Sequence, residues 1–386
     1  DARLSSNGRG IPENLRLRAY RTDPDGALLG PLGATHFALG DVATNATALG
    51  IQTTAGRGAF VTNRPLNRPA SFDRTVFRGE LPDGWEAELY RNDQLIGYVQ
   101  SRGDGRFEFL DIQLSYGQNR FEVVLYGPQG QVRRETKIIP VGLDSIPPRE
   151  TYYWAAVQDA GRDLIDLGNV EPSDFLGWRG GFGLERGLDP KTSVAASLFT
   201  SELRGQRQYY LEASVRRAVG PTLIEVAGAA NLVGGYALRG QVLAQVGQAL
   251  IAGESAWLFG NYQSERYDRD VRRFNSISLD HALKLGRQYI PLRGEIRYIE
   301  RADGGSRIEA ASRMSFNINR LNASAELEWT QEHSGRGDTP SSRLDSALRL
   351  SGRIGGLRLR GEATFALSGD AGFRESKITG EWRAGE

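Results

Sequence analysis

The stretch 305-GSRIEAASRMSFNINRLNASAELEWTQEH-333 decides the fold, because its apolar and polar residues alternate on both sides of a short turn. In its first half Ile308 and Phe316 fall on one face, whereas Arg307 and Arg313 fall on the other. A period of two indicates a β-strand, since successive side chains point to opposite faces of a sheet. One face of each strand is therefore apolar and the other is charged.

Segments of this kind, each about 10–13 residues long, follow one another from about residue 149 to the end of the chain. Strands in soluble sandwiches typically run about 5–6 residues, whereas a membrane β-strand needs roughly 9–11. Lipid cannot satisfy an unpaired backbone N–H or C=O, so a membrane-spanning sheet has to close on itself. The sequence predicts an all-β fold: a large antiparallel transmembrane β-barrel with an inserted β-sandwich plug domain.

Composition excludes several classes of protein. The chain has 48 glycines in 386 residues, which suits many tight turns, and it has no cysteine, which excludes thiol catalysis and disulfides. Lys and Arg number 48 against 47 Asp and Glu, so the near-neutral charge does not point to nucleic acid. No apolar run approaches the roughly 18 residues of a membrane helix.

No catalytic or metal-binding pattern is present in the sequence. His36, His281 and His333 are scattered, without a second ligand at metal-binding spacing. A nucleophile elbow, a P-loop and a Rossmann fingerprint are all missing. The sequence therefore predicts a protein that is not an enzyme, with no catalytic residue, no metal and no cofactor.

Three segments divide the chain. Residues 1–72 are expected to form early barrel strands, near 14–23, 35–44 and 57–65. Residues 73–141 have shorter strands with turns about ten residues apart, which is typical of an independent sandwich. Residues 142–386 follow a proline-bearing connector and are expected to hold about fourteen long strands. These are expected near 150–159, 174–186, 191–203, 206–218, 221–233, 235–246, 250–263, 271–285, 289–300, 306–318, 320–332, 342–353, 356–367 and 372–383.

Apolar positions of the sandwich predict its core. The expected core residues are Trp85, Leu89, Phe107, Phe109, Phe121 and Val123. In the long-strand segment, aromatic residues gather near the strand ends, where amphipathic rings would sit at the two membrane interfaces. They are Tyr152 to Trp154, Trp178, Tyr209, Tyr210, Trp257, Tyr289, Tyr298, Trp329 and Trp382.

If the apolar face meets lipid, the charged face lines a water-filled interior. The residues expected there are Arg239, Glu254, Asp280, Lys284, Arg293, Glu295, Arg297, Arg307, Glu309, Arg313, Glu326, Glu328, Arg349, Arg353, Arg358, Arg360 and Glu362. Basic and acidic residues often neighbour each other, and paired charges would let protein slide past without sticking. The alternative is that these charges solvate the interior and stiffen the wall through cross-strand pairs.

A resemblance emerges when the segments are read in order. The stretches 36-HFALGDVAT-44 and 57-RGAFVTNR-64 resemble the lead into the plug of fimbrial outer-membrane ushers. In this chain, 76-VFRGELPDGWEAELYRNDQLIGYV-99 and the stretch from 104 to 142 resemble the usher plug itself. Next, 146-IPPRETYYWAAVQDAG-161 resembles the segment that returns from the plug to the usher barrel, and 182-FGLERGLDPKTSVAAS-197 resembles the hairpin after it.

This resemblance implies a chaperone–usher assembly platform in the bacterial outer membrane, a wide barrel gated by an Ig-like plug. The implied partners are pilus subunits and a periplasmic chaperone. Outer-membrane lipids are expected from the apolar face of the strands, and no nucleic acid is expected from the near-neutral charge. The implied function is non-enzymatic secretion and assembly of fimbrial subunits, with the plug swinging aside for cargo. Fewer strands flank the plug here than in the family, so the chain is expected to form part of a barrel.

Two alternatives stay open at this point. The barrel could be a pore for polysaccharide or small solutes, which rows of aromatic side chains in the interior would favour. The sandwich could instead be an exposed adhesive or structural module. The position of the sandwich relative to the long strands distinguishes these readings.

Overall fold

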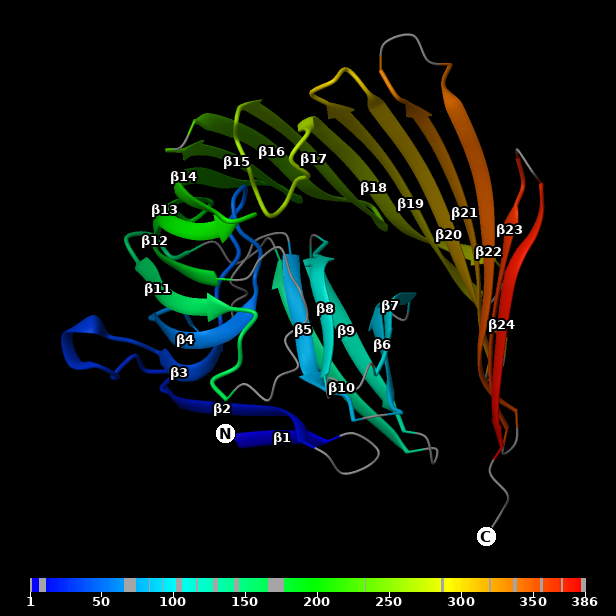
Figure 1. Ribbon diagram of the computed structural model, residues 1–386, viewed down its shortest axis with the longest axis horizontal. Coiled ribbons are helices and arrows are strands. Elements are labelled where there is room, and N and C mark those ends of the chain that lie inside the picture. Colours follow the sequence, from blue (N-terminus) through cyan, green and yellow to red (C-terminus); the bar gives the residue numbers. More distant parts are fainter. Residues whose placement is uncertain are drawn as a thin grey trace. The chain divides into compact units, whose positions relative to one another are not determined.

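The computed structural model is built almost wholly of β-strands (Figure 1). It describes residues 2–6, 12–65, 74–82, 84–92, 94–101, 106–115, 117–127, 131–141, 146–165, 177–232, 234–285, 288–318, 321–335, 339–354, 357–368 and 371–382. Within these ranges the helical structure is a single turn of 3₁₀-helix at Gly30–Leu32. None of the described helical structure has the length and apolar character needed to cross a membrane.

Ten strands cover the first part of the chain, up to the end of the sandwich. They are β1 (Ala2–Ser6), β2 (Pro12–Thr22), β3 (His36–Ala43), β4 (Ala55–Thr62), β5 (Arg74–Glu80), β6 (Glu86–Arg91), β7 (Gln94–Gln100), β8 (Arg106–Gln113), β9 (Gly117–Tyr126) and β10 (Val132–Val141). The strands expected near 14–23, 35–44 and 57–65 correspond to β2, β3 and β4, whereas β1 is not among the expected strands.

The long strands of the second part lie close to their expected positions. They are β11 (Thr151–Ala160), β12 (Gly177–Asp189), β13 (Thr192–Leu203), β14 (Gln206–Val219), β15 (Thr222–Asn231), β16 (Gly235–Val246), β17 (Ala249–Gly260), β18 (Val271–Leu285), β19 (Gln288–Arg301), β20 (Ser306–Ile318), β21 (Leu321–His333), β22 (Ser341–Ile354), β23 (Leu357–Ala366) and β24 (Gly372–Trp382). The number of long strands expected after the connector is confirmed.

The chain divides into two compact units. Unit 1 contains residues 1–240 and 258–269, and unit 2 contains residues 241–257 and 270–386. Strands β16 and β17 each contribute residues to both units.

In unit 1, strands that follow one another in the sequence pair antiparallel, with one exception at β4, whose next partner is β11. Strand β1 pairs with β2, β2 with β3 and β3 with β4, and β4 then pairs directly with β11. Strands β11 to β15 continue the series, and β11 to β14 can be followed side by side in Figure 1. The six strands β5 to β10 are therefore an insertion between two hydrogen-bonded neighbours.

The inserted strands form two small sheets that share a core. One sheet has the order β10-β9-β6-β7, and the other pairs β5 with β8. The Phe77 ring of β5 lies 4.7 Å from the Phe121 ring of β9, centroid to centroid. Gly97 of β7 leaves room for Phe109 of β8, since a Cβ there would come within 2.8 Å of that ring. These cross-sheet contacts make residues 74–141 a β-sandwich.

In unit 2, consecutive strands form antiparallel hairpins from the paired segments of β17 and β18 through to β24. Alternate connections differ in length. The connection from β18 to β19 covers residues 286–287 and that from β20 to β21 covers 319–320, whereas that from β21 to β22 covers 334–340. Short and longer connections therefore lie at opposite ends of the strands.

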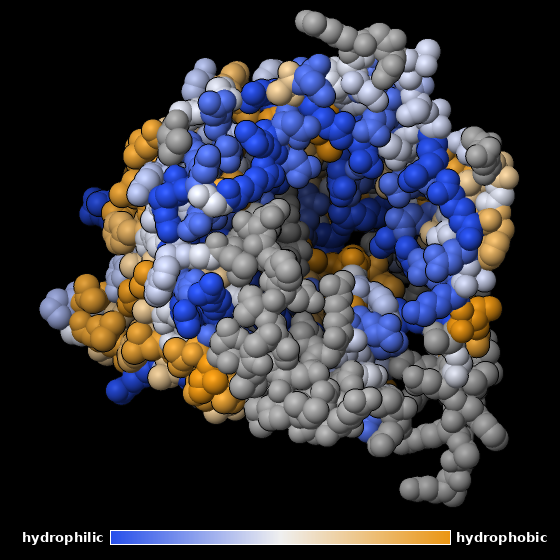
Figure 2. Space-filling model, viewed as in Figure 1, coloured by the Kyte–Doolittle hydropathy of each residue, from blue (hydrophilic) through white to orange (hydrophobic). Residues whose placement is uncertain are grey.

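Both units carry large apolar side chains, well exposed, on one face of their long strands. In unit 1 this apolar face carries Phe182, Leu198 and Leu211, which are register neighbours along β12 to β14, and the register partners Val215 and Val226 of β14 and β15. In unit 2 it carries Ile277, Ile296, Met314, Leu327 and Leu348. Figure 2 shows hydrophobic and hydrophilic residues gathered on separate surfaces. The opposite face of the same strands is called the polar face here.

Three aromatic residues differ from the sequence expectation. Tyr152, Trp154 and Tyr210 are buried, and Trp154 and Tyr210 lie on the polar face rather than at a lipid interface. Trp154 is accommodated by a glycine: a Cβ on Gly183 of β12 would lie 2.2 Å from its Nε1 atom. The absence of a side chain there lets the indole approach the backbone of the neighbouring strand closely.

The other expected interface aromatics divide as follows. Trp178, Tyr209 and Trp257 are exposed, and Tyr153, Tyr298 and Trp329 are partly exposed; all six lie on the apolar face by their register. The side chains of Tyr289 and Trp382 lie outside the described residues.

Substitution Gly183→Ala is expected to lower the free energy of unfolding by about 1–3 kcal/mol, because the new methyl group overlaps the Trp154 indole. Urea unfolding followed by tryptophan fluorescence measures the change. The double variant Gly183→Ala with Trp154→Leu should recover part of the loss. Equal stability of Gly183→Ala and the parent chain would contradict this packing.

Candidate functional site: the polar face and the loops that cover it

The polar face of unit 2 is a ladder of alternating charges that crosses several strands. Glu295 of β19 pairs with Arg293 at 3.5 Å and with Arg297 at 2.6 Å. Arg297 also reaches Glu309 of β20 at 3.5 Å, and Arg293 reaches Asp280 of β18 at 3.7 Å. Each of these charges therefore has an opposite charge on its own strand or on the next one.

A second ladder follows on β20 to β23. Glu326 of β21 accepts hydrogen bonds from Arg313 and Arg349, both at distances under 3 Å. Arg349 of β22 also contacts Glu362 of β23 at 2.9 Å. The side chain of Glu326 is only 20% exposed although it carries a charge, whereas its apolar neighbour Leu327 is 46% exposed. At these two neighbouring positions the charged side chain is thus more enclosed than the apolar one.

The structure places the remaining predicted interior residues as follows. Arg307 pairs with Glu309 at 2.8 Å, Arg239 and Glu254 are buried, and Glu328 and Arg360 are half-buried. Lys284 is exposed. The side chains of Arg353 and Arg358 lie outside the described residues.

Unit 1 has its own charged cluster on β14 to β16. Glu225 of β15 accepts two hydrogen bonds from Arg216 of β14, the shorter at 2.8 Å, and lies 3.6 Å from Arg239 of β16. The side chains of Glu225 and Arg239 are almost completely buried. Burial of charges is costly unless they are paired, so this cluster depends on its internal pairing.

A loop between β3 and β4 covers the polar face of unit 1. This loop, residues 44–54, is called the inner loop here. The Glu212 carboxylate on β14 accepts hydrogen bonds from the backbone N–H of Ala48 at 2.6 Å and from that of Leu49 at 3.2 Å. Gln158 of β11 donates to the Thr54 carbonyl at 3.1 Å. Side chains of two long strands therefore satisfy backbone groups that a buried loop would otherwise leave unpaired.

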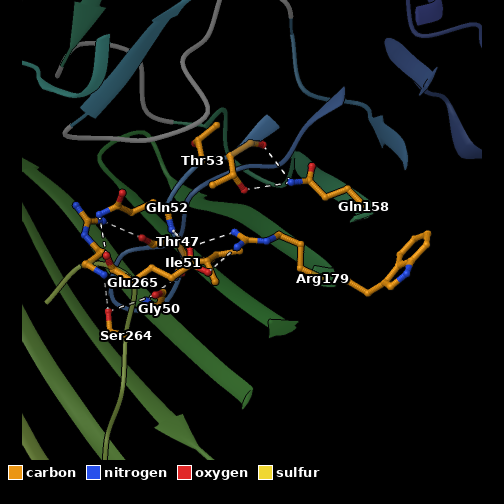
Figure 3. A network of polar contacts seen from close by, with 12 residues as sticks. Thr47, Gly50, Ile51, Gln52, Thr53, Gln158, Arg179, Ser264 and Glu265 are labelled. Carbon is orange, nitrogen blue, oxygen red and sulfur yellow. Dashed lines mark hydrogen bonds and ion pairs between the residues drawn. The ribbon is translucent and has the colours of Figure 1, made fainter. Parts of the chain in front are cut away.

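A second segment, residues 261–269 between β17 and β18, meets the inner loop (Figure 3). The Glu265 carboxylate accepts from the Gln52 backbone N–H at 2.9 Å, and the Glu265 N–H donates to the Gly50 carbonyl at 2.9 Å. Ser264 Oγ donates to the Leu49 carbonyl at 2.6 Å. The two segments thus hold each other through main-chain and side-chain bonds together.

An ion pair connects this contact to the strands. Arg179 of β12 lies 2.8 Å from the Glu265 carboxylate, and both side chains are 1% exposed. Burial raises the pKa of Glu265 above its ordinary value, whereas the Arg179 charge and the Gln52 N–H act in the opposite direction. Without Arg179 the buried carboxylate would have little compensation for its desolvation.

The inner loop also rests on aromatic rings. The rings of Phe199 and Tyr210 are stacked at 4.7 Å between centroids, and Tyr262 meets Tyr210 edge-on at 6.0 Å. The loop approaches this cluster through Gly50, where a Cβ would come within 2.2 Å of the Phe199 ring. Only glycine fits between the loop backbone and that ring without displacement.

The sandwich touches the same loop. Arg78 of β5 donates through Nη2 to the Thr53 carbonyl at 3.1 Å, and its Nε lies 3.4 Å from Glu108 of β8.

The predicted core of the sandwich is found for five of its six residues. These five are buried: Leu89, Phe107, Phe109, Phe121 and Val123. Trp85 is half-buried, against the backbone of Gly127.

Sequence reasoning missed the residues that hold the inner loop. Glu212 and Arg179 occupy polar-face positions and follow the same alternation as the predicted residues, so the pattern could have found them. Glu265 and Gly50 lie outside any alternating strand. Glu265 contacts Gln52 across 213 residues of sequence, and nothing local signals that contact.

Comparisons with known proteins give weak likenesses. No family model matches the chain, and no curated protein matches it in sequence. A structure of the P pilus usher (PapC) translocation pore aligns with 96% of this chain and 88% of its own, with a TM-score of 0.41 and 12% identity. PapC in an Escherichia coli P pilus tip assembly intermediate, PapC-PapD-PapK-PapG, aligns with 98% of this chain and 55% of its own, with a TM-score of 0.35 and 13% identity.

A loop L8 deletion mutant of OmpT, an outer membrane protein of Vibrio cholerae, aligns with 79% of this chain and 97% of its own, with a TM-score of 0.27 and 11% identity. Likenesses at these levels do not show a family.

Replacement Glu212→Ala should free the inner loop, because the N–H groups of Ala48 and Leu49 lose their acceptor. Amide hydrogen exchange read by mass spectrometry should show faster exchange in residues 44–54. Glu362→Gln removes the polar-face carboxylate that pairs with Arg349 in unit 2 and should leave this exchange unchanged. Unchanged exchange in Glu212→Ala would contradict the assigned role.

Substitution Arg179→Met should lower the free energy of unfolding by about 3–5 kcal/mol, because it leaves the Glu265 charge buried without a partner. The double variant Arg179→Met with Glu265→Met should recover most of that loss, since no charge then stays buried. Denaturant titration of the three proteins measures both effects. A double variant as unstable as Arg179→Met would show that the ion pair is not the cause.

Proposed function

We propose that this chain forms wall and plug of a gated, usher-like pore in a bacterial outer membrane, which passes protein subunits and hydrolyses nothing. The observation that carries the proposal is the inverted exposure of the long strands. Their large apolar side chains are exposed, while the charges between them are paired and partly enclosed. A soluble protein buries such apolar side chains, whereas a membrane wall presents them to lipid.

The position of the sandwich supports gating. It is inserted between β4 and β11, which are hydrogen-bonded neighbours, so both its connections return to one place on the wall. Its described contact with the inner loop is polar, through Arg78 and the Thr53 carbonyl. A polar contact of this kind can be broken at small cost, because water replaces the hydrogen bond once the sandwich moves.

The inner loop is the element that would hold the sandwich at rest. It is bound to the wall by Glu212 and Gln158 and to the 261–269 segment by Glu265. These bonds fix the loop backbone, so Thr53 presents its carbonyl to Arg78 from a rigid support. The pore would be closed because the inner loop is held by several bonds to the strands, while the sandwich is held to that loop by the Arg78–Thr53 hydrogen bond.

The ladders of paired charges suit a protein cargo. Each arginine of the ladders already has a carboxylate partner, so a passing protein surface finds few unpaired charges to bind. Pilus subunits delivered by a periplasmic chaperone are the cargo that the resemblance of residues 36–197 to fimbrial ushers suggests. A solute pore would be the better description if the open protein passed sugars but no protein.

Excision of residues 66–145, with a short Gly-Ser linker in their place, should open the pore. Thr62 and Trp154 are register partners, so the shortened chain can close as a hairpin without disturbing β4 or β11. Planar-bilayer recordings should show a large, steady conductance that the full chain lacks. Arg78→Ala in the full chain should give brief openings. An excised protein that inserts but conducts no more than the full chain would contradict the plug role.

Membrane insertion should depend on the apolar face. Ile296→Arg, near the middle of β19, should cost about 2–4 kcal/mol of folding free energy in vesicles, because the charge would face hydrocarbon. Ala311→Arg is the matched control on the polar face, where Glu295 and Glu328 are its register partners. Folding yields in vesicles measure both. Equal losses for the two variants would count against lipid on the Ile296 face.

A further inference from the structure

A small cluster interrupts the apolar face of unit 2 at one end of β17, β18 and β19. The guanidinium carbon of Arg273 lies 4.2 Å from the ring centroid of Trp257 and 5.9 Å from that of Tyr298. Trp257 is the register partner of Arg273 on the neighbouring strand. Further along the same face Ile277 and Ile296 are more than half exposed. The cation therefore lies beside an apolar band.

Hydrogen bonds fix the rings that hold this cation. Trp257 donates through Nε1 to Ser255 Oγ at 3.0 Å, and Ser255 donates to Asn275 Oδ1 at 2.8 Å. The indole is thus oriented by two strands. A guanidinium held over aromatic rings is attracted by their negative faces, and its edge stays available to an acceptor.

Arg273 differs from the polar-face arginines in its charge partner. Among the described residues no carboxylate lies within 4.0 Å of its guanidinium, and its buried Nε–H has no acceptor. Its register partner Glu300 instead accepts from the Tyr298 hydroxyl at 3.5 Å. An oriented guanidinium that makes no ion pair within 4.0 Å with any described residue, at the end of an apolar band, is complementary to an anionic group that reaches it from outside the chain.

The cluster lies at the strand ends with the longer connections. Residues 261–270 join β17 to β18 and residues 302–305 join β19 to β20, whereas 247–248 and 286–287 form the connections at the other ends. In outer-membrane barrels the longer loops face the cell exterior, and aromatic girdles lie at headgroup level. The cluster is therefore placed at an interface, where lipid phosphates and not acyl chains are the neighbours.

We infer that Trp257, Arg273 and Tyr298 form a binding site for the phosphate group of an anionic lipid headgroup on the outer surface of the wall. The inference rests on the proposed membrane function. Arg273 supplies the charge and the donors, Trp257 and Tyr298 orient it, and the exposed Ile277 and Ile296 meet the acyl chains. The site selects a phosphate monoester over a zwitterionic headgroup, because only the former brings an uncompensated negative charge.

The test uses the full chain and two lipids, phosphatidic acid and phosphatidylcholine. Protein in detergent micelles is titrated with each lipid, and native mass spectrometry counts the lipids retained. Arg273→Gln should need about tenfold more phosphatidic acid for equal occupancy, since it loses a charge-assisted contact. Glu300→Gln should bind more tightly than the parent, because it removes a nearby negative charge.

Arg217→Gln is the matched control. Arg217 also lies on an apolar face, that of unit 1, but it donates to Thr192 Oγ1 at 3.0 Å and has Asp189 within 4.0 Å. Its loss should leave phosphatidic acid retention unchanged. Equal retention by Arg273→Gln and the parent, or equal retention of the two lipids by the parent, would overturn the inference.

Flotation with phosphatidylcholine vesicles separates this failure from failure of the proposed function. A chain that does not float with vesicles refutes the membrane proposal itself, and with it the lipid site. A chain that floats, but shows no effect of Arg273→Gln on phosphatidic acid, refutes the lipid site alone.

Discussion

Apolar and charged side chains alternate along the same strands, and the rest of the structure depends on the separation of these two sets onto opposite faces. Fully burying one large apolar side chain is worth about 1.5–3 kcal/mol. Ten side chains left half exposed in water would forgo on the order of 10 kcal/mol, as much as the whole stability of a typical domain. Leu198, Val226, Ile296 and Leu348 are all about half exposed or more. Lipid is the environment in which that exposure carries no cost.

On the polar face, charged side chains and buried backbone groups need partners, and they find them in two ways. In unit 2 side chains satisfy one another, as Glu295 does with Arg293 and Arg297. In unit 1 side chains also accept hydrogen bonds from backbone N–H groups. Glu212 accepts from the N–H groups of Ala48 and Leu49 and thereby fixes the inner loop. Isolated exposed ion pairs contribute about 0–1 kcal/mol, so the ladders matter chiefly for keeping the face free of unpaired charge. The loop contacts, which are buried, are where stability is concentrated.

The long strands could be predicted because their signal is local. Alternation over 306–318 and 321–333, broken by a turn, places every side chain on a face without knowledge of any other strand. The inner loop could not be predicted in this way, since its partners Glu212 and Glu265 lie 164 and 213 residues away from the atoms they bind. The burial of Trp154 on the polar face depends on Gly183 of the next strand, which strand periodicity does not consider. The local sequence pattern thus predicts the long strands, whereas the position of the inner loop depends on tertiary contacts that the pattern does not contain.

Lipid contact on alternate residues can be measured directly, because the chain has no cysteine and single cysteines can be added one at a time. Spin labels placed at successive positions 293–298 and 324–329, in protein folded into vesicles, report collision with oxygen in lipid and with a water-soluble nickel complex. If lipid contacts the apolar face, access has a period of two, with oxygen access highest at 296 and 327 and nickel access highest at 295 and 326. Equal nickel access at all positions, or the opposite phase, would contradict it.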